Sequence, residues 1–379
     1  MSSPKLNIAI IEPVGGHGGM EFYDYGLAQG LAQNEVNVTL YTCNETVVRQ
    51  YTNVTTTKHF GNTWGKQKIP KLLSFLRGYR RSFSECKQNN VDVVHLHFFQ
   101  IGWLNLMVLR MARRYPFKKV ITLHDVDPLV NNASSRIHRY TYALVDHVIV
   151  HNNFSKKELT KKDIEPEKIT IVAHGNYLPF VKTIENDSFN NSDQFNLLFF
   201  GQIKEMKGLD VLIEAIAIAN KTNPNIYLTI AGRPWHTNAE KYHEMVLQLG
   251  LSEQISEHYN YIPNEEVINY FEACDLVVLP YKRIYQSGVL LLSMSYGKPC
   301  LTSDLEPFSD IIDDGVNGYL FRSESAQDLS KRILEIAADK TKLLGISANA
   351  SVILQEKYDW KVIGEQTKIV YNNLLNQNN

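Results

Sequence analysis

The sequence has few cysteines and no long apolar segment. Its 379 residues include four cysteines that are far apart and form no Cys-x-x-Cys pair: Cys43, Cys86, Cys274 and Cys300. Neither a disulfide framework nor a zinc site is therefore expected, and the thiols are predicted to be reduced and mostly buried. No stretch approaches the roughly 20 apolar residues of a membrane-spanning helix, and the first residues read as a strand rather than a signal peptide. These absences favour a cytoplasmic protein.

Net charge is also nearly absent, because 39 Lys and Arg residues oppose 40 Asp and Glu residues. The two signs are nevertheless unevenly distributed: residues 1–184 hold 23 basic and 14 acidic side chains, and the remainder holds 16 and 26. A basic half is attracted to anionic surfaces. Its richest stretch, Lys66–Lys87, is interpreted first as a surface helix and second as a contact with the inner membrane face or with an anionic acceptor. No nucleic-acid partner is expected.

The length predicts two domains, since single domains usually hold about 100–200 residues. Short apolar runs alternate with helix-length segments, which is typical of parallel sheets with helices on both faces. The runs are residues 7–11, 36–42, 91–98, 119–124 and 147–151, and then 195–201, 226–232, 276–281 and 298–304.

A polar segment rich in Asn and Ser separates the two sets of apolar runs. We therefore expect an N-terminal domain over residues 1–184, a linker over 185–196 and a C-terminal domain over 197–360. Apolar residues at helical spacing near the C-terminus predict a closing helix over 361–379. Because ligands of open parallel sheets bind beyond the carboxyl ends of the strands, the turns at those ends are the places to look for a site.

The turn after the first apolar run is rich in glycine, with Gly15, Gly16, Gly18 and Gly19 directly before a predicted helix. Glycines at this place allow backbone N–H groups to approach a phosphate or a sugar. Turn geometry alone is the alternative interpretation. The spacing is not Gly-x-Gly-x-x-Gly, which argues against an NAD-linked oxidoreductase.

Histidines mark the ends of two strands in the first half. His124 ends the run 119–124, where its ring could hydrogen-bond a sugar hydroxyl or an attacking group; the alternative is a ring satisfied by loop carbonyls. His95 and His97 share one face of their strand, but no third ligand is evident, so no metal site is predicted.

The turn after residues 195–201 carries two lysines, Lys204 and Lys207, and Gly208 then precedes a long amphipathic helix. A helix N-terminus with ammonium groups beside it suits a diphosphate, because the helix dipole and the point charges act on the same anion. The alternative is that Lys207 is an ordinary surface lysine.

A second turn of this kind opens the apolar helix that follows residue 286. The hydroxyl of Ser287 and the N–H groups of Gly288 and Val289 could hold the remaining phosphate oxygens. The alternative is that Ser287 acts only as the N-cap of the helix. Together with the glycine turn, the two turns predict a cleft for a diphosphate-linked ligand.

These motifs resemble the retaining glycosyltransferases of family four, whose GT-B fold has two Rossmann-like domains facing each other across a cleft. The resemblance extends over nearly the whole chain, and its final segment, residues 358–375, is similar to the family's last helix, which crosses back to the first domain. It rests on the glycine turn, on LHDV (123–126), FFGQIKEMKGLDVLIEA (199–215) and YIPNEEVINYFEACDLVVLPY (261–281), and on the SG, YGKP and DGVNGYLF motifs within residues 287–321.

The resemblance implies an α/β enzyme that moves a sugar from a nucleoside-diphosphate sugar to an acceptor hydroxyl. The second domain would bind the donor and the first would bind a saccharide or lipid-linked acceptor, in cell-surface polysaccharide or glycolipid synthesis. It also implies that no metal and no cofactor are needed, because lysines supply the positive charge. The roles carried over are diphosphate binding for Lys204, Lys207, Ser287 and Gly288, approach to the donor for Gly18 and Gly19, and contact with the transferred sugar or the acceptor for His124.

Two features depart from the family's pattern. Gln202 stands where the family has an arginine, so that Lys204 would have to replace its charge. The family's pair of glutamates is also missing, and its positions are Ile284 and Leu292. These changes leave the nucleotide and the sugar open, and they keep two alternatives in view: a non-catalytic nucleotide-sugar-binding partner of another transferase, and a GT-B epimerase.

Overall fold

The computed structural model describes residues 5–15, 19–61, 68–126, 135–162, 164–182, 184 and 193–377, without the side chains of residues 68–71 and 135–136. It divides into two compact units. Unit 1 consists of Met1–Gly175 and Lys357–Asn379, and unit 2 of Asn176–Glu356. The divisions thus fall after residues 175 and 356, whereas the sequence placed them at 184 and 360. Most of the predicted linker, residues 185–192, lies outside the described residues.

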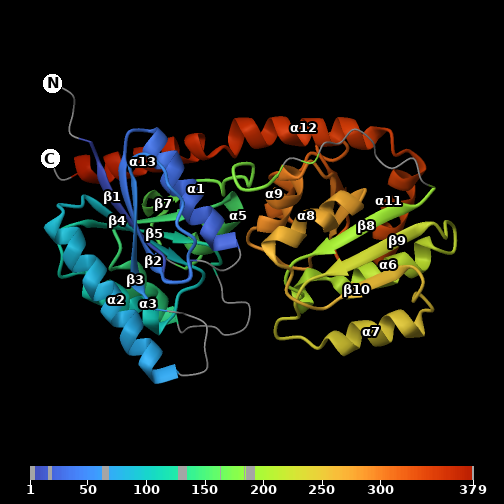
Figure 1. Cartoon of the computed structure of the whole chain (residues 1–379), viewed down its shortest axis with the longest axis horizontal. Helices are drawn as coiled ribbons and strands as arrows, with labels where there is room; N and C mark the ends of the chain where they lie inside the picture. The colour runs from blue at the N-terminus through green and yellow to red at the C-terminus, as the bar shows by residue number, and fades with distance from the viewer. Residues whose placement is uncertain are drawn as a thin grey trace. The chain divides into compact units, whose positions relative to one another are not determined.

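Unit 1 contains a parallel sheet in the order β3-β2-β1-β4-β5-β6-β7. Its strands are β1 (Asn7–Ile11), β2 (Asn37–Cys43), β3 (Val54–Phe60), β4 (Val93–Phe98), β5 (Lys118–Leu123), β6 (His147–Val150) and β7 (Ile169–Ile171). Its helices are α1 (Gly19–Gln33), α2 (Lys68–Gln88), α3 (Trp103–Ala112), α4 (Ser135–Tyr142), α5 (Asn153–Thr160) and α13 (Trp360–Asn376), with a 3-10 turn at Pro166–Lys168. Helices α1 and α13 cover one face of the sheet, and α2 and α3 cover the other (Figure 1).

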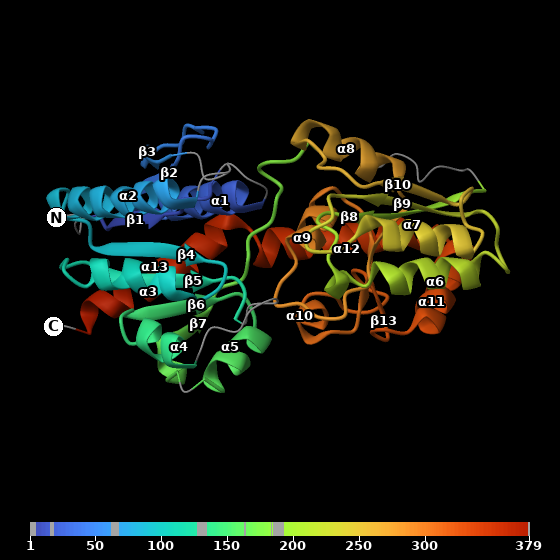
Figure 2. The same ribbon diagram turned by 90° about the horizontal axis from the view of Figure 1, so that it is seen from below.

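Unit 2 repeats this plan with a parallel sheet in the order β10-β9-β8-β11-β12-β13. Its strands are β8 (Phe195–Phe200), β9 (Ile226–Ala231), β10 (Ile255–His258), β11 (Leu276–Leu279), β12 (Cys300–Ser303) and β13 (Tyr319–Phe321). Its helices are α6 (Leu209–Ala219), α7 (Ala239–Gln248), α8 (Asn264–Ala273), α9 (Gly288–Ser295), α10 (Glu306–Ser309), α11 (Ala326–Ala338) and α12 (Lys342–Lys357), with a 3-10 turn at Glu205–Lys207. Helices α6 and α11 pack side by side against the apolar core of this sheet (Figure 2).

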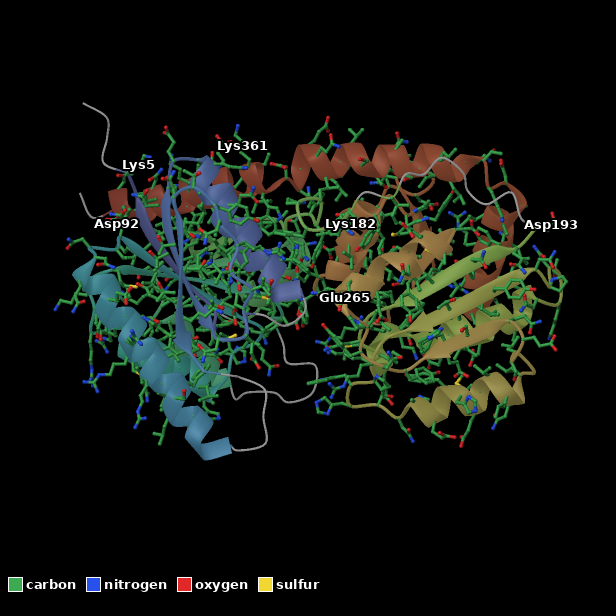
Figure 3. All side chains as sticks on the ribbon, viewed as in Figure 1. Lys5, Asp92, Lys182, Asp193, Glu265 and Lys361 are labelled. Carbon is green, nitrogen blue, oxygen red and sulfur yellow. The ribbon has the colours of Figure 1, made fainter. Side chains whose placement is uncertain are left out.

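An aspartate directly before a strand fixes the strand register at three places. Each of these carboxylates accepts a hydrogen bond from a backbone N–H group near the start of the neighbouring strand. Asp92 (labelled in Figure 3), Asp146 and Asp275 accept from Asn7, Lys119 and Asn196, with N···O distances of 2.8, 2.7 and 2.7 Å. Because the register is fixed at the amino ends, the residues that follow the carboxyl ends of these strands are also brought side by side.

All four cysteines are free and buried, as predicted. Among the helices that the structure describes, none is both long enough and apolar enough to cross a bilayer.

The closing helix α13 is held against α1 by contacts that require glycine. A Cβ atom added at Gly30 would overlap the backbone carbonyl of Trp360, and one added at Gly364 would overlap the backbone of Gly30. The side chain of Asn34 donates a hydrogen bond to the Lys361 carbonyl at 2.8 Å, and the Lys368 ammonium donates one to the Asn34 carbonyl at 2.7 Å. The two helices therefore approach through their backbones, which ties the end of the chain to unit 1.

Replacing Gly364 with alanine should separate α1 from α13. We expect Gly364→Ala to lower the free energy of unfolding of unit 1 by about 1–3 kcal/mol, because overpacking forces backbone shifts. The matched control is Gly345→Ala on α12, where an added Cβ meets no atom within 4 Å. That change should leave stability unchanged or raise it by up to about 1 kcal/mol, because alanine favours helix. Thermal unfolding of both variants tests this contact, and a Gly364→Ala protein as stable as the wild type would contradict it.

Candidate functional site

The turn after β8 in unit 2 is shaped by glycines in the left-handed region of backbone space. Gly201 has φ +97°, and Gly208, the N-cap residue of α6, has φ +66°. A Cβ atom at Gly208 would overlap the Pro280 carbonyl at the end of β11. Only glycine therefore allows the 3-10 turn Glu205–Lys207 to pass this close to the neighbouring strand.

Lys207 ends this 3-10 turn, and its ammonium group is desolvated. Its Nζ lies 5.1 Å from the centroid of the Tyr281 ring, and burial lowers the pKa of Lys207 to about 8. Within the described part of the chain no carboxylate forms an ion pair with Lys207, whereas nearby Lys282 pairs with Asp210 at 2.6 Å. A desolvated cation without a carboxylate partner favours the binding of an anion.

The N-terminus of α9 lies beside the same turn. The Ser287 hydroxyl accepts a hydrogen bond from the Leu290 N–H group at 3.1 Å, so Ser287 is the N-cap of the helix. A Cβ atom placed on Gly201 would lie 3.2 Å from Val289 Cγ2 and 3.4 Å from Lys207 Nζ. The structure therefore brings Lys207 and the first turn of α9 together around Gly201. An ammonium group beside the N-terminus of a helix is an arrangement suited to an anion.

The other residues predicted for unit 2 lie nearby in the chain but are placed less tightly. Gln202 is exposed directly after Gly201, and Lys204, at the start of the 3-10 turn, is half-buried. Gly288 packs closely against a buried tyrosine, because a Cβ atom there would lie 2.8 Å from Tyr177 Oη. Ile284 is buried and Leu292 is half-buried on α9, so these two positions offer no oxygen to a ligand.

In unit 1 the carboxyl edge of the sheet carries a cluster of buried histidines. His97 lies in β4, His124 and His151 follow β5 and β6, and His174 follows β7; all four rings pack around the ring of Tyr23 on α1, with centroid distances of 4.9–5.5 Å. Burial lowers the pKa of each of these histidines, so the rings are neutral near pH 7. His124 therefore occupies the predicted edge, inside a group that the sequence did not reveal.

The outcome for the remaining residues of unit 1 is mixed. Gly19 is exposed as the first residue of α1, and Gly18 lies outside the described residues. The rings of His95 and His97 are in contact but have different hydrogen-bond partners: the His95 ring lies 2.7 Å from both Tyr371 Oη and Thr122 Oγ1, whereas the His97 ring bonds Asp24.

Two buried carboxyl groups lie at the end of β1 and on α1. Asp24 Oδ1 lies 2.8 Å from His97 Nδ1, and Glu12 accepts a hydrogen bond from the Val14 N–H group at 2.7 Å. Burial, together with the nearby Asp24, raises the pKa of Glu12 to about 8. Glu12 is therefore protonated at neutral pH in the folded protein.

Sequence reasoning missed Glu12, which directly follows a predicted strand, and it missed His151 and Tyr281, which end the predicted runs 147–151 and 276–281. That position was the available signal, because such residues meet at the carboxyl edge of a parallel sheet.

The raised pKa of Glu12 makes stability depend on pH. In the unfolded chain the carboxyl ionises above about pH 4.5, whereas the folded protein keeps the proton until about pH 8. The free energy of unfolding should therefore fall as pH rises through this window. Glu12→Gln keeps an acceptor for Val14 and removes the ionisation, so the variant should gain stability over the wild type by about 4 kcal/mol at pH 8 and by little at pH 4.5.

Thermal unfolding between pH 4.5 and pH 8 checks this expectation. The control is Glu356→Gln at an exposed position, which should show no comparable pH-dependent gain. A Glu12→Gln protein whose stability follows that of the wild type at every pH would show that Glu12 is ionised in the fold.

The comparisons with known proteins concern the family and the fold of the chain. Residues 17–176 match the model described as Glycosyltransferase Family 4, and residues 180–351 match Glycosyl transferases group 1. The chain is 22% identical over 328 residues to a D-inositol 3-phosphate glycosyltransferase of Corynebacterium aurimucosum, covering 81% of this chain and 77% of the relative. It is 29% identical over 167 residues to a GDP-mannose:glycolipid 4-beta-D-mannosyltransferase of Xanthomonas campestris, covering 44% and 45%.

A solved structure shares the whole fold. HepE of Anabaena, solved in complex with UDP-glucose, superposes with a TM-score of 0.70 at 18% identity and covers 97% of this chain and 100% of its own. The two family matches together span both parallel sheets apart from β1, with their boundary between residues 176 and 180. The chain therefore belongs to the retaining family-four glycosyltransferases with the GT-B fold.

Proposed function

We propose that this glycosyltransferase uses a nucleoside-diphosphate sugar as donor and binds its diphosphate in unit 2, through Lys207 and the first turn of α9. The observation that carries the proposal is the desolvated Lys207 ammonium, which has no ion-pair partner among the described residues and lies next to the N-terminus of a helix. HepE, which shares the fold, was solved with UDP-glucose bound. The negative charges of a pyrophosphate would interact with both the ammonium group and the helix N-terminus.

In this proposal the site acts mainly when the donor bond breaks. Departure of the nucleoside diphosphate builds negative charge on its oxygens, and a fixed cation and helix N–H groups stabilise that charge without reorganisation. Lys207 and the backbone of α9 make the main contribution, Lys204 adds a second positive charge, and Gln202 and Ser287 shape the turn. Because ammonium groups supply the charge, we propose that no metal ion is required.

In unit 1 we assign His124 to contact with a hydroxyl of the transferred sugar or of the acceptor. Gly19, with Gly18, would allow the donor to approach the start of α1. The acceptor would be a saccharide or a glycolipid; the Xanthomonas relative is named for transfer to a glycolipid.

Removing the Lys207 ammonium should weaken catalysis more than donor binding. We expect Lys207→Ala to lower kcat about 100-fold or more with UDP-glucose or GDP-mannose, whichever the wild type uses, because the lost charge acts on the departing diphosphate. Wild-type turnover should persist in EDTA. Steady-state kinetics with a donor panel, preceded by a thermal-shift screen, provide the measurement.

The matched control is Lys221→Ala, which removes an exposed lysine from the same unit and should leave kcat unchanged. The pH dependence gives a second check: with the pKa of free Lys207 at about 8, the affinity for UDP should fall above that pH. Lys207→Arg should shift this loss to higher pH. Full turnover by Lys207→Ala would remove the proposal.

We also propose that unit 1 contacts an anionic membrane surface through the exposed face of α2. On this helix the rings of Phe75 and Tyr79 pack against the Phe60 ring of unit 1, at centroid distances of 6.2 and 5.1 Å. Arg77, Arg80 and Arg81 are exposed. These aromatic side chains thus pack within unit 1 and are not available to insert into a membrane. Attraction to an anionic membrane would therefore depend on the charge of the arginines.

Neutralising the arginines of α2 should weaken binding to anionic vesicles. We expect Arg77→Gln, Arg80→Gln and Arg81→Gln together to reduce binding to phosphatidylserine-containing vesicles about tenfold or more, since each charge near the surface contributes about 1 kcal/mol. Sedimentation with vesicles at two salt concentrations measures this. The control replaces Arg110, Arg113 and Arg114, all exposed near the end of α3, by glutamine and changes the net charge equally. Equal loss in both triple variants would contradict a specific role for α2.

A further inference from the structure

His124 and His151 are paired by the register of the unit 1 sheet. Thr122 of β5 lies opposite Ile149 of β6, so two residues further on His124 lies opposite His151. Their rings face each other with centroids 5.0 Å apart, and His151 Nε2 lies 3.2 Å from His124 Nδ1. Both rings are buried.

The second nitrogen of His151 determines which way this hydrogen bond runs. His151 Nδ1 lies 2.9 Å from the carbonyl oxygen of Val172, and a carbonyl oxygen can only accept. His151 Nδ1 therefore carries a hydrogen. The carbonyl is held in place by the backbone, because the Val172 N–H group donates to the Val150 carbonyl at 2.9 Å.

Both rings are neutral, which completes the assignment. Burial and the neighbouring His174 lower the pKa of His151 to about 3, and burial and His151 hold the pKa of His124 well below its usual range. A neutral His151 with hydrogen on Nδ1 has a lone pair on Nε2, so His124 Nδ1 must be the donor between the two rings. A neutral His124 with hydrogen on Nδ1 then carries its own lone pair on Nε2.

We propose that His151 is a positioning residue that fixes His124 as the Nδ1–H tautomer, so that His124 Nε2 accepts a hydrogen bond from a substrate hydroxyl. This inference rests on the proposed function, which assigns His124 to a hydroxyl of the sugar or the acceptor. A hydroxyl that donates to Nε2 is held by its hydrogen and keeps its oxygen lone pairs available. The opposite tautomer would present an N–H group and bind such a hydroxyl only through its oxygen.

Further aromatic rings pack against the pair. Tyr23 contacts the edges of both rings, with centroids 4.9 Å from His124 and 5.5 Å from His151. His174, whose Nδ1 lies 2.7 Å from the Gly175 carbonyl, packs on the far side of His151 at 5.5 Å. The two hydrogen bonds therefore run in one direction: His124 donates to His151, and His151 donates to the Val172 carbonyl.

The tautomer can be measured without turnover. We expect long-range proton–nitrogen NMR spectra of histidine-labelled full-length protein, with His124 assigned by a His124→Gln variant, to show His124 protonated on Nδ1 alone. In His151→Phe this signature should change to a mixture or to the other tautomer. A wild-type His124 protonated on Nε2 would overturn the inference, and donor binding by thermal shift would still report separately on the diphosphate site.

Kinetics provide the second readout. We expect His151→Phe to lower kcat about tenfold or more while the KM for the donor changes less than about twofold. His151→Gln keeps an acceptor for His124 and a donor for Val172, so it should recover most of the lost kcat. The control is His147→Gln at the other end of β6, where the ring bonds Thr170 at 2.8 Å, and its kcat should match the wild type. Equal losses in His151→Phe and His151→Gln, with both variants folded, would indicate a packing role alone and overturn the proposal.

Discussion

Because both sheets are parallel, every strand delivers the residue after it to the same edge of its sheet, and each candidate group of this protein depends on that constraint. In unit 1 the edge collects His97, His124, His151 and His174 around Tyr23. In unit 2 it collects the turn after β8 and the start of α9 around Gly201. Aspartates at the opposite edge fix the strand register and so determine which residues become neighbours. A shift of the register by one residue would turn each side chain to the other face of the sheet.

Burial, more than any partner, decides the charge of the groups at these edges. Desolvation lowers the pKa of Lys207 and raises that of Glu12, so both groups move toward their neutral forms. The consequences differ because of what surrounds each group. Lys207 lies beside a helix N-terminus, which favours anions. An anion bound there would replace the hydration that the ammonium group loses on burial. Glu12 is buried beside the Asp24 carboxyl, and burial first and Asp24 second favour its protonated form.

The strands that the sequence predicted and those it missed differ in one physical respect. All the predicted strands lie inside the sheets, with neighbours on both sides, and their apolar residues form continuous runs. The missed strands, β3, β7, β10 and β13, are the four edge strands of the two sheets. They are short or partly exposed, as in the polar sequence VTTTKHF of β3, and an edge strand needs no continuous apolar run.

The candidate site followed the same pattern. Lys207 and the start of α9 could be predicted because a lysine or a glycine after a strand is visible in the sequence. The direction of the His124 hydrogen bond could not, because it depends on the carbonyl of Val172, which directly follows β7, and β7 was not predicted. The sequence also could not decide between the two interpretations of Ser287. Its hydroxyl caps α9, so that only the backbone of that turn is left to bind an anion.

The two apolar positions, Ile284 and Leu292, bear on how selective such an enzyme can be. A buried carboxylate that accepts a hydrogen bond from one hydroxyl of a sugar discriminates strongly against sugars that lack this hydroxyl, because the carboxylate is then left without a partner. Ile284 and Leu292 impose no such penalty, and an apolar contact discriminates between similar groups by only about 1–3 kcal/mol. Under the proposed function, an acceptor for the sugar's hydroxyls would then be a group that keeps a lone pair under burial. A neutral imidazole with its hydrogen fixed on the inner nitrogen is such a group, which is why the tautomer of His124 matters more in this chain than it would beside a pair of glutamates.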